Sequence, residues 1–403
     1  MLNKDGVREL AYVVAIDEIR PIHNYDRVEH ARVGGWWVIV KKDQFKVGDL
    51  AIYIEVDAKV PEQEPFMFLE PKHFKVKTQK MCKVLSQGLL MHPADFGWNL
   101  GKADGVDNGS IIIAGSKTFK LGDFVTEFLK ITYADAEDNK RKAPSADKYK
   151  KMAQRHGKLF SKQPFRWLMK RTWGKKLLFL FFGKKRDKKT EWPTWVVKTD
   201  EERIECIPHT LLDKTPWIAS EKLDGTSTTF TMKRGRFGKN LFLVCSRNVV
   251  FDKPDKKCYY ETNVYTEMAQ KYDVENVLAS ILLSNPELKW VTLQGETYGA
   301  GIQKRDYGLT EHRFAGFNYI TSKDGRWNSI KARDFMQNFN IPWVPILDEN
   351  YILPDTVEEL RAFSHSEGSR IDGIIKEGIV FRSQDGSRSF KCVDPEFLLK
   401  YHN

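Results

Sequence analysis

The sequence predicts an α+β protein in which a small β-barrel precedes a larger domain of antiparallel sheets with flanking helices. A chain of 403 residues is long for one hydrophobic core, so two domains and an additional segment are expected. Short runs rich in β-branched and aromatic residues dominate residues 8–61, whereas strand-like and helix-like segments are mixed from Trp192 onward. We therefore expect the barrel in residues 1–131, a basic insert in residues 132–190 and the larger domain in residues 191–403.

Composition excludes several classes of protein. With 41% hydrophobic and 12% aromatic residues, the chain can bury a normal core. Its five cysteines are scattered and form no CxxC pair, which argues against a zinc site or a disulfide framework. The N-terminus lacks the apolar core of a signal peptide, and the longest apolar run, LLFLFF, is far shorter than the roughly 20 residues of a membrane span. We expect a soluble, cytoplasmic monomer without membrane contact.

The barrel prediction depends on strand-like runs separated by Gly, Asp and Pro turns. FKVGD (45–49) is typical of a turn between two of the runs. The runs are ELAYVVAIDEIRPI (9–22), HARVGGWWVIVKK (30–42), LAIYIEVDAKVP (50–61) and VLSQGLLMHP (84–93). A handful of short strands in one small domain suggests an OB-like barrel, which commonly binds nucleic acid. A barrel that serves only as a structural lid is the alternative.

The basic character of the chain is concentrated in one segment. Residues 139–189 carry 19 Lys and Arg against two acids, or +17, and the rest of the chain carries −6. Residues 147–160 and 165–186 are compatible with basic amphipathic helices, in which four aromatic residues interleave with lysines: Trp167, Trp173, Phe179 and Phe182. Such a segment can bind a polyanion, but its aromatic residues can equally dock it onto its own domain, and a membrane-surface role is a third alternative.

Turn and cap signals divide the larger domain into strands and helices. Helices are expected at 329–339, 356–368 and 394–401, with Thr356 as the N-cap of the second. SQDGS (383–387) is a hairpin turn signal. The expected strands are 216–219, 228–232, 288–299, 312–320, 372–383 and 388–393.

A lysine two residues before an aspartate and a glycine, in KLDG (222–225), is the strongest candidate for chemistry. Taken alone, three fixed positions occur by chance at a level of about 5%, and a charged β-turn is the simpler interpretation. Five downstream segments, however, each place a charged or aromatic residue in an expected strand or at its end. They are CSRN (245–248), LQGETYG (293–299), FAGFNY (314–319), KEGIVFRS (376–383) and SFKCV (389–393).

In this order, the six segments resemble the nucleotidyltransferase motifs shared by ATP-dependent ligases and messenger-RNA capping enzymes, whose fold is an ATP-grasp-like ligase domain. WVVKTDEERIE (195–205), SQGLL (86–90) and the run from Gly34 to Glu62 are similar to one family of RNA ligases. That family, the fifth, is of the Naegleria and Deinococcus type and carries an OB module ahead of its transferase domain. The resemblance implies an adenylyltransferase over residues 191–403.

A lysine must be neutral to attack phosphorus, whereas its ordinary pKa is about 10.4, and burial and nearby cations can depress it. The resemblance implies that Lys222 attacks the α-phosphorus of ATP and carries AMP covalently. Asp224, Glu296 and Glu377 come from separate strands and are expected to hold a hydrated Mg²⁺ or Mn²⁺, because magnesium prefers a few carboxylates and several waters.

Further roles follow from residue type and from the resemblance. Lys391 is expected to neutralise a phosphate oxygen during catalysis, and Arg247 to contact a phosphate or the ribose. Phe317 is expected to stack on adenine, and Glu221 to help recognise the adenine edge. Gly225 is expected to let the turn approach the nucleotide closely.

The order of domains separates the candidate functions. DNA ligases and capping guanylyltransferases use the same lysine but place their OB domain after the last motif, and here only twelve residues follow Lys391. A binding protein with an inactive transferase fold is a further alternative, which the intact lysines and acids disfavour. We expect an ATP-dependent RNA ligase that joins 3′-OH and 5′-phosphate RNA ends, in a nicked duplex or an RNA/DNA hybrid, for RNA repair.

Overall fold

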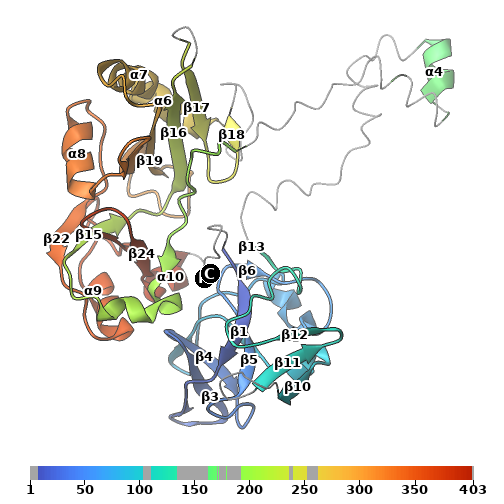
Figure 1. Cartoon of the computed structure of the whole chain (residues 1–403). Coiled ribbons are helices and arrows are strands. Elements are labelled where there is room, and N and C mark those ends of the chain that lie inside the picture. Colours follow the sequence, from blue (N-terminus) through green and yellow to red (C-terminus); the bar gives the residue numbers. More distant parts are fainter. Residues whose placement is uncertain are drawn as a thin grey trace. The chain divides into compact units, whose positions relative to one another are not determined.

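A computed structural model of the protein divides the chain into two units, one formed by Met1–Ala134 with Trp192–Asn403 and the other by Asp135–Glu191 (Figure 1). The residues that the structure describes are 8–102, 110–133, 162–169, 171, 178, 192–235, 239–251 and 262–401. The domain boundaries expected from the sequence stay predictions.

The N-terminal strands form the predicted barrel. Strand β5 (Leu50–Ile54) is the middle strand of one of its sheets. Strand β5 pairs antiparallel with β1 (Ala11–Ala15) and with β9 (Leu89–Met91). Its residues are buried on both faces: Leu50, Ile52 and Ile54 contribute to one apolar cluster, and Ala51 and Tyr53 to another. Because side chains alternate along a strand, β5 supplies two cores at once.

Shorter elements complete the barrel. A second sheet runs β2–β3–β4, formed by Glu18–Ile22, Tyr25–Val33 and Trp36–Lys41. The other elements are β6 (Ala58–Lys59), η1 (Met67–Lys72), β7 (Gln79–Met81), β8 (Val84–Ser86), η2 (Pro93–Phe96), β10 (Asn99–Lys102), β11 (Ser110–Ala114), β12 (Lys117–Phe119) and β13 (Thr132–Tyr133). The single strand expected at 84–93 is two strands, because Gly88 turns the chain at a φ of +94° against the Tyr53 ring.

Two sheets form the larger domain (Figure 1). The six-stranded sheet is antiparallel throughout and runs β18 (Val250–Phe251), β17 (Leu241–Cys245), β16 (Thr226–Lys233), β19 (Trp290–Gly299), β20 (His312–Thr321) and β21 (Gly325–Arg326). The five-stranded sheet runs β14 (Glu202–Arg203), β24 (Ser389–Val393), β23 (Gly378–Ser383), β15 (Trp217–Lys222) and β22 (Ile346–Tyr351). Only the β14–β24 pair of the described strands is parallel.

Helices cover these sheets. Helices α6 (Val264–Lys271) and α7 (Val274–Ser284), which the sequence did not predict, pack on the six-stranded sheet through a shared apolar cluster. The three expected helices are present as α8 (Ser329–Gln337), α9 (Val357–Ser366) and α10 (Pro395–Tyr401). Thr356 caps α9 as predicted and forms a capping box with Glu359. The larger domain also contains the short helices η3 (Ile204–Cys206) and η4 (Pro208–Leu212).

Buried polar side chains join the barrel to the larger domain. The Arg361 guanidinium donates to the Glu205 carboxylate at 2.7 Å and to the side-chain oxygen of Gln87, in the barrel, at 2.8 Å. The Cys206 thiol donates to the fully buried Glu55 at the end of β5, at 3.1 Å. Charges removed from water must be paired, so these contacts hold the two domains together.

The predicted basic insert is described only around α4 (Gln163–Met169). Trp167 on this helix is 49% exposed, and the Arg171 guanidinium lies 4.3 Å from the centre of its ring. The helix expected at 147–160 lies outside the described residues, as do Trp173, Phe179 and Phe182. No helix among the described residues is long and apolar enough to cross a membrane.

Candidate active site

The KLDG lysine lies at the end of a buried strand. Trp217 and Ala219 of β15 pack into the core below the five-stranded sheet, so that Lys222 projects from the opposite face. In the register with β23, Lys222 pairs with Gly378, and this pairing places Lys222 beside Glu377. The Lys222 ammonium donates to the Glu377 carboxylate at 2.6 Å.

The three carboxylates that are expected to hold the cation act on this lysine. Burial lowers the pKa of Lys222, but Glu377, Glu296 and Asp224 together raise it above the ordinary value. The expectation of a depressed pKa is therefore wrong for the protein's own groups, because the acids outweigh burial. Burial also raises the pKa of Glu296 to about 8, with Lys222 opposing the shift and Glu377 and Asp224 adding to it.

The acids suit a hydrated cation better than a directly bound one. Among the described residues, no three His, Cys, Asp or Glu side chains are arranged to hold a metal ion directly. The raised pKa of Glu296 nevertheless indicates that Asp224, Glu296 and Glu377 repel one another at one place. A divalent ion that keeps its waters would relieve this repulsion at longer range, which fits Mg²⁺ or Mn²⁺.

Close packing explains the glycine of the turn. A Cβ atom on Gly225 would lie 2.4 Å from the Thr297 carbonyl oxygen and 2.9 Å from the Glu296 Cγ atom. The Asp224 amide donates to the Tyr307 hydroxyl at 2.6 Å, and Gln303 donates to the Gly225 carbonyl at 3.0 Å. Gly225 thus lets β19 approach the lysine turn, and its predicted role at the nucleotide stays a prediction.

A second charged group, which includes two of the predicted residues, surrounds Asp200. The Lys391 ammonium lies 3.0 Å from one Asp200 oxygen, and the Arg247 guanidinium lies 2.8 Å from the other. Burial lowers the pKa of Lys391 to about 8, although Asp200 opposes the shift. The pKa of Asp200 is well below its usual range despite its burial, because Lys391 and Arg247 stabilise its charge.

Asp200 was not among the residues singled out in the sequence. It is the first of three consecutive acids, the last of which begins β14, and only the tertiary structure distinguishes it from Glu201 and Glu202. Arg247 is also covered on one face: its guanidinium lies 4.7 Å from the centre of the Tyr133 ring, which belongs to β13 of the barrel.

Glu221 faces away from Lys222, as expected for neighbouring residues on a strand. Its carboxylate is 1% exposed and accepts hydrogen bonds from the Ser369 hydroxyl and from the Arg370 amide, the latter at 2.8 Å. Burial raises the pKa of Glu221, although these two hydrogen bonds oppose the shift. Both carboxylate oxygens therefore hold the loop that precedes Glu377, and the predicted contact with adenine stays a prediction.

Arg305, which the sequence did not single out, holds the same loop from the other side. Its side chain is 3% exposed and donates to Asp372 at 2.6 Å and to the Ile375 carbonyl. The same guanidinium lies 4.3 Å from the centre of the Tyr307 ring, whose hydroxyl accepts from Asp224. One arginine therefore contacts both the loop that leads to Glu377 and the ring that holds Asp224.

Phe317 lies on β20, half-buried, in a small apolar cluster with Leu223 and Tyr307. The Arg382 guanidinium lies 5.5 Å from the centre of the Phe317 ring. Burial lowers the pKa of Arg382 to about 10, with Glu201 opposing the shift. The ring is thus close to the turn of Lys222, and stacking on adenine stays a prediction.

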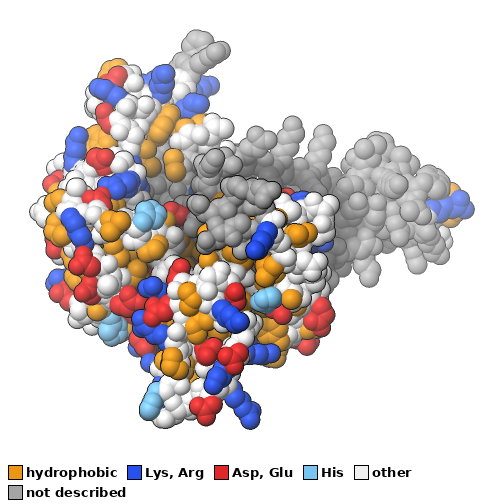
Figure 2. Space-filling model, turned by 60° about the horizontal axis from the view of Figure 1, so that its bottom comes forward, with side chains coloured by type: hydrophobic (Ala, Val, Ile, Leu, Met, Phe, Trp, Pro, Cys, Tyr) orange, Lys and Arg blue, Asp and Glu red, His pale blue; other side chains and the backbone are white. Residues whose placement is uncertain are grey.

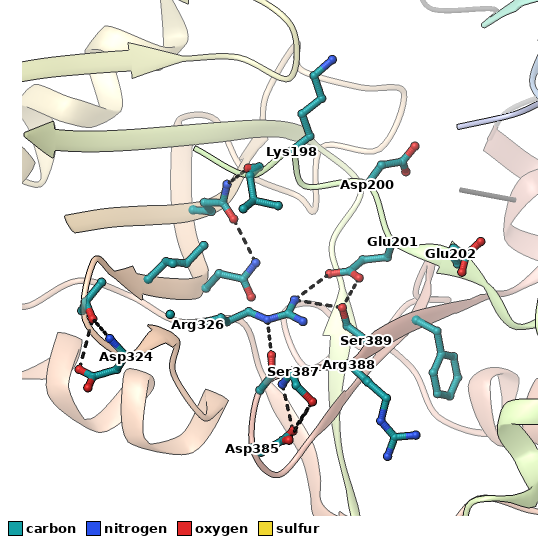
Figure 3. Close-up of a pocket in the computed structure, with 18 of the residues that line it drawn as sticks. Lys198, Asp200, Glu201, Glu202, Asp324, Arg326, Asp385, Ser387, Arg388 and Ser389 are labelled. Carbon is teal, nitrogen blue, oxygen red and sulfur yellow. Dashed lines mark hydrogen bonds and ion pairs between the residues drawn. The ribbon is translucent and has the colours of Figure 1, made fainter. Parts of the chain in front are cut away.

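A hollow of about 1140 Å³ lies beside this site and includes Asp200 and Glu201 in its lining (Figure 3). Its two arginines are paired: Arg326 lies 3.7 Å from Glu201, and Arg388 contacts Asp213. Figure 3 shows the Arg326 guanidinium directed toward Glu201 and Ser389. Lys222 is not among the residues that line this hollow.

Comparisons with known proteins agree with this geometry. Residues 215–402 match the family described as RNA ligase, and residues 10–93 match an OB-fold domain. No curated protein matches the chain. Naegleria gruberi RNA ligase, solved with PPi, is 24% identical, with a TM-score of 0.68 over 98% of this chain and 99% of that one. A variant of the same enzyme, solved with ATP and Mn, is 23% identical, with a TM-score of 0.70 over 98% of this chain and 100% of that one.

At these identities the solved structures establish the shared fold, so the predicted OB-like barrel followed by a ligase domain is confirmed. The match to the RNA ligase family confirms the resemblance drawn from the six motifs. Residues 215–402 thus match the RNA ligase family, residues 10–93 ahead of them match an OB-fold domain, and together these matches support an enzyme that forms phosphodiester bonds.

Proposed function

We propose that this ligase uses ATP to join an RNA 3′-OH end to a 5′-phosphate end through a covalent lysyl–AMP intermediate. The observation that carries the proposal is the position of Lys222, whose ammonium contacts Glu377 and interacts with Glu296 and Asp224. A lysine surrounded by acids at the end of a buried strand suits a nucleophile whose charge changes during the reaction.

Three displacements at phosphorus follow from this nucleophile. The Lys222 amine loses a proton and attacks the α-phosphorus of ATP, so that a P–N bond forms, the bond to the β-phosphate breaks and pyrophosphate leaves. An oxygen of the RNA 5′-phosphate then attacks the same phosphorus, the P–N bond breaks and the lysine regains its proton, which gives AppN. The RNA 3′-OH finally attacks the 5′-phosphate, loses its proton and releases AMP.

Asp224, Glu296 and Glu377 would hold the divalent cation through its waters. When bound, the cation supplies positive charge next to the α-phosphate and offsets the three carboxylates. Because these carboxylates raise the pKa of Lys222, their neutralisation favours the amine form that attacks.

Lys391 and Arg247 interact electrostatically with groups of this cluster, Arg247 with Glu296 and Lys391 with Lys222. Lys391 is buried and held by Asp200, so its ammonium is fixed in place before substrate binds. Fixed charge costs little reorganisation during the reaction, and we assign Lys391 to the phosphate oxygens of both adenylyl transfers. Arg247 keeps 31% of its side chain exposed and is assigned to a phosphate or the ribose. Phe317 is assigned to the adenine ring.

The preferred substrate that we propose is a nicked duplex with an RNA 3′-OH end, which the enzyme seals as a monomer. In this proposal the OB-fold domain binds the duplex and the ligase domain carries AMP. Substrates of this kind arise in RNA repair.

Labelling with α-³²P-ATP or α-³²P-GTP in the presence of Mg²⁺ tests the first step. We expect a labelled protein band with ATP that Lys222→Ala abolishes and that Lys323→Ala, a change of an exposed lysine in the turn after β20, retains. Label from neither nucleotide, or label that survives Lys222→Ala, would contradict the mechanism. Label from GTP alone would indicate a guanylyltransferase. Nicked RNA, hybrid and DNA duplexes then define which ends are joined.

A further inference from the structure

A second hollow of the molecule is lined by lysines that alternate along one extended segment. In residues 74–79, Phe74, Val76 and Thr78 are buried, whereas the side chains between them, Lys75 and Lys77, are partly exposed. The segment is held as a strand edge against β6, because the Val60 amide donates to the Phe74 carbonyl and the Val76 amide to the Ala58 carbonyl, each at 2.9 Å. The period of two therefore directs the lysines to one face.

The hollow has a volume of about 530 Å³, and no acidic residue is among those that line it. We call it the lysine groove; it is lined by Pro71, Lys72, His73, Lys75, Lys77, Gln79, Lys80, Met81 and Leu399. On the face of the molecule in Figure 2, by contrast, basic and acidic side chains are interspersed. A surface formed by lysines without acids favours a polyanion.

The lysines of the groove are largely without counter-charges. Lys80 pairs with Glu396 at 2.9 Å, but Lys72, Lys75 and Lys77 form no ion pair with any described residue. Burial lowers the pKa of Lys77, and the positive charges of Lys304 and Lys75 lower it further, although the Asp57 carboxylate opposes the shift. These like charges disfavour one another in the free protein, and an anion bound between them would remove that cost.

The groove is connected to the lysine that carries AMP. Lys304, which interacts electrostatically with Lys77, follows Gln303, and Gln303 donates to the Gly225 carbonyl in the turn after Lys222. Leu399, which also lines the groove, belongs to α10, a helix that contacts Lys80 through Glu396 and begins just after Lys391 on β24. A chain of phosphates that lies along the groove would thus continue toward the reacting end.

We propose that the lysine groove binds the sugar–phosphate backbone of the RNA that is being joined and guides the reacting end to Lys222. This rests on the proposed function. Contacts with phosphates position a nucleic acid without reading its sequence, which suits an enzyme that must act on ends of any sequence.

The test compares two double variants of the full chain. Lys75→Gln/Lys77→Gln removes two charges from the groove, and Lys41→Gln/Lys42→Gln removes two from exposed positions at the end of β4 in the same domain. Binding of a nicked RNA duplex is measured by fluorescence anisotropy over a series of salt concentrations. Each phosphate neutralised on a duplex contributes about 0.9 to the salt slope, so the groove variant should have a slope shallower by roughly 2.

We expect the groove variant to lose about tenfold or more in affinity at low salt and in kcat/KM for sealing, while its rate of labelling by ATP equals that of wild type. The Lys41/Lys42 variant should match wild type in every measurement. An unchanged salt slope in the groove variant, or an equal change in both variants, would overturn the proposal. A wild-type protein that ATP does not label would instead refute the proposed function, and loss of labelling by the groove variant alone would indicate misfolding rather than lost binding.

Discussion

The candidate active site of the ligase domain and the lysine groove of the OB-fold domain use charged side chains in opposite ways. Around Lys222 and Lys391, each ammonium is in contact with a carboxylate, at 2.6 Å and 3.0 Å respectively. In the lysine groove, Lys72, Lys75 and Lys77 have no such partner among the described residues. Paired charges hold reacting groups in place before substrate binds. Unpaired charges of one sign repel one another, so binding an anion between them is favourable.

The largest effect should come from breaking the pairing at the nucleophile. Glu377→Gln keeps the shape of the side chain but removes the charge next to Lys222 and one of the acids for the cation. We expect the rate of labelling by ATP to fall on the order of 10² to 10³-fold, the loss typical of one preorganised charged contact. The Mg²⁺ concentration for half-maximal labelling should rise as well. A variant with wild-type labelling at low Mg²⁺ would remove Glu377 from the site.

A smaller loss of labelling rate is expected when the loop that carries Glu377 is released, while Lys222 and Glu377 themselves are unchanged. Arg305→Met removes the buried cation that pairs with the partly buried Asp372 and releases the loop that leads to Glu377. Breaking a buried pair destabilises by about 3–5 kcal/mol, so the temperature of unfolding should fall. As a positioning residue, Arg305 should affect the Mg²⁺ dependence of labelling, and Arg305→Lys should restore part of the rate at a temperature where both variants are folded. Arg370→Met, at an exposed pair in the same loop, is the matched control.

The pH dependence of sealing tests the buried cation. Burial lowers the pKa of Lys391 to about 8. Its side chain is therefore mostly charged below that pH and mostly neutral above it. Lys391→Arg keeps the charge at every pH used, because arginine titrates above about 12. The ratio of the variant rate to the wild-type rate should therefore be flat below pH 8 and rise by up to about tenfold for each further pH unit. A ratio that is constant through pH 9.5 would contradict this assignment.

The smallest effect is expected where a cation is already paired. Arg388 lies in the hollow next to the active site and contacts Asp213. Its side chain is 56% exposed, and an exposed pair contributes roughly 0–1 kcal/mol. Arg388→Gln should therefore leave the salt slope of RNA binding unchanged, in contrast to the two lysines of the groove. A slope that becomes shallower by about 1 would extend the RNA path into this hollow.

Local signals in the sequence predicted the elements that depend on local chemistry. The hairpin turn at 383–387 joins β23 and β24, and Thr356 caps α9, because turns and caps are determined by a few adjacent residues. The motif lysine and the three acids that interact with it were singled out differently, from the order of six segments and their resemblance to a known family, and their roles stay predictions. Helices α6 and α7 were not predicted. Their apolar residues pack on the six-stranded sheet, and no local signal in the sequence reveals that contact.

Tertiary partners explain what the sequence could not predict. The strand expected at 372–383 begins only at Gly378, because the Arg305 side chain binds the carbonyl of Ile375 and the Asp372 side chain binds the amide of Ile374. These backbone groups are therefore unavailable to the sheet. Asp200 is similar: its importance arises from two cations more than 40 residues away in the chain, which no local pattern reveals.

The Tyr133 ring has a consequence for how the enzyme can be divided. It comes from the last strand of the OB-fold domain, yet it covers one face of Arg247 in the ligase domain, and Asp200 pairs with that same arginine. The OB-fold domain is therefore not structurally independent of the ligase domain. Its separation from the ligase domain would uncover a side chain of the candidate active site, so we expect either half, when grafted onto another protein, to have an altered arrangement around Asp200.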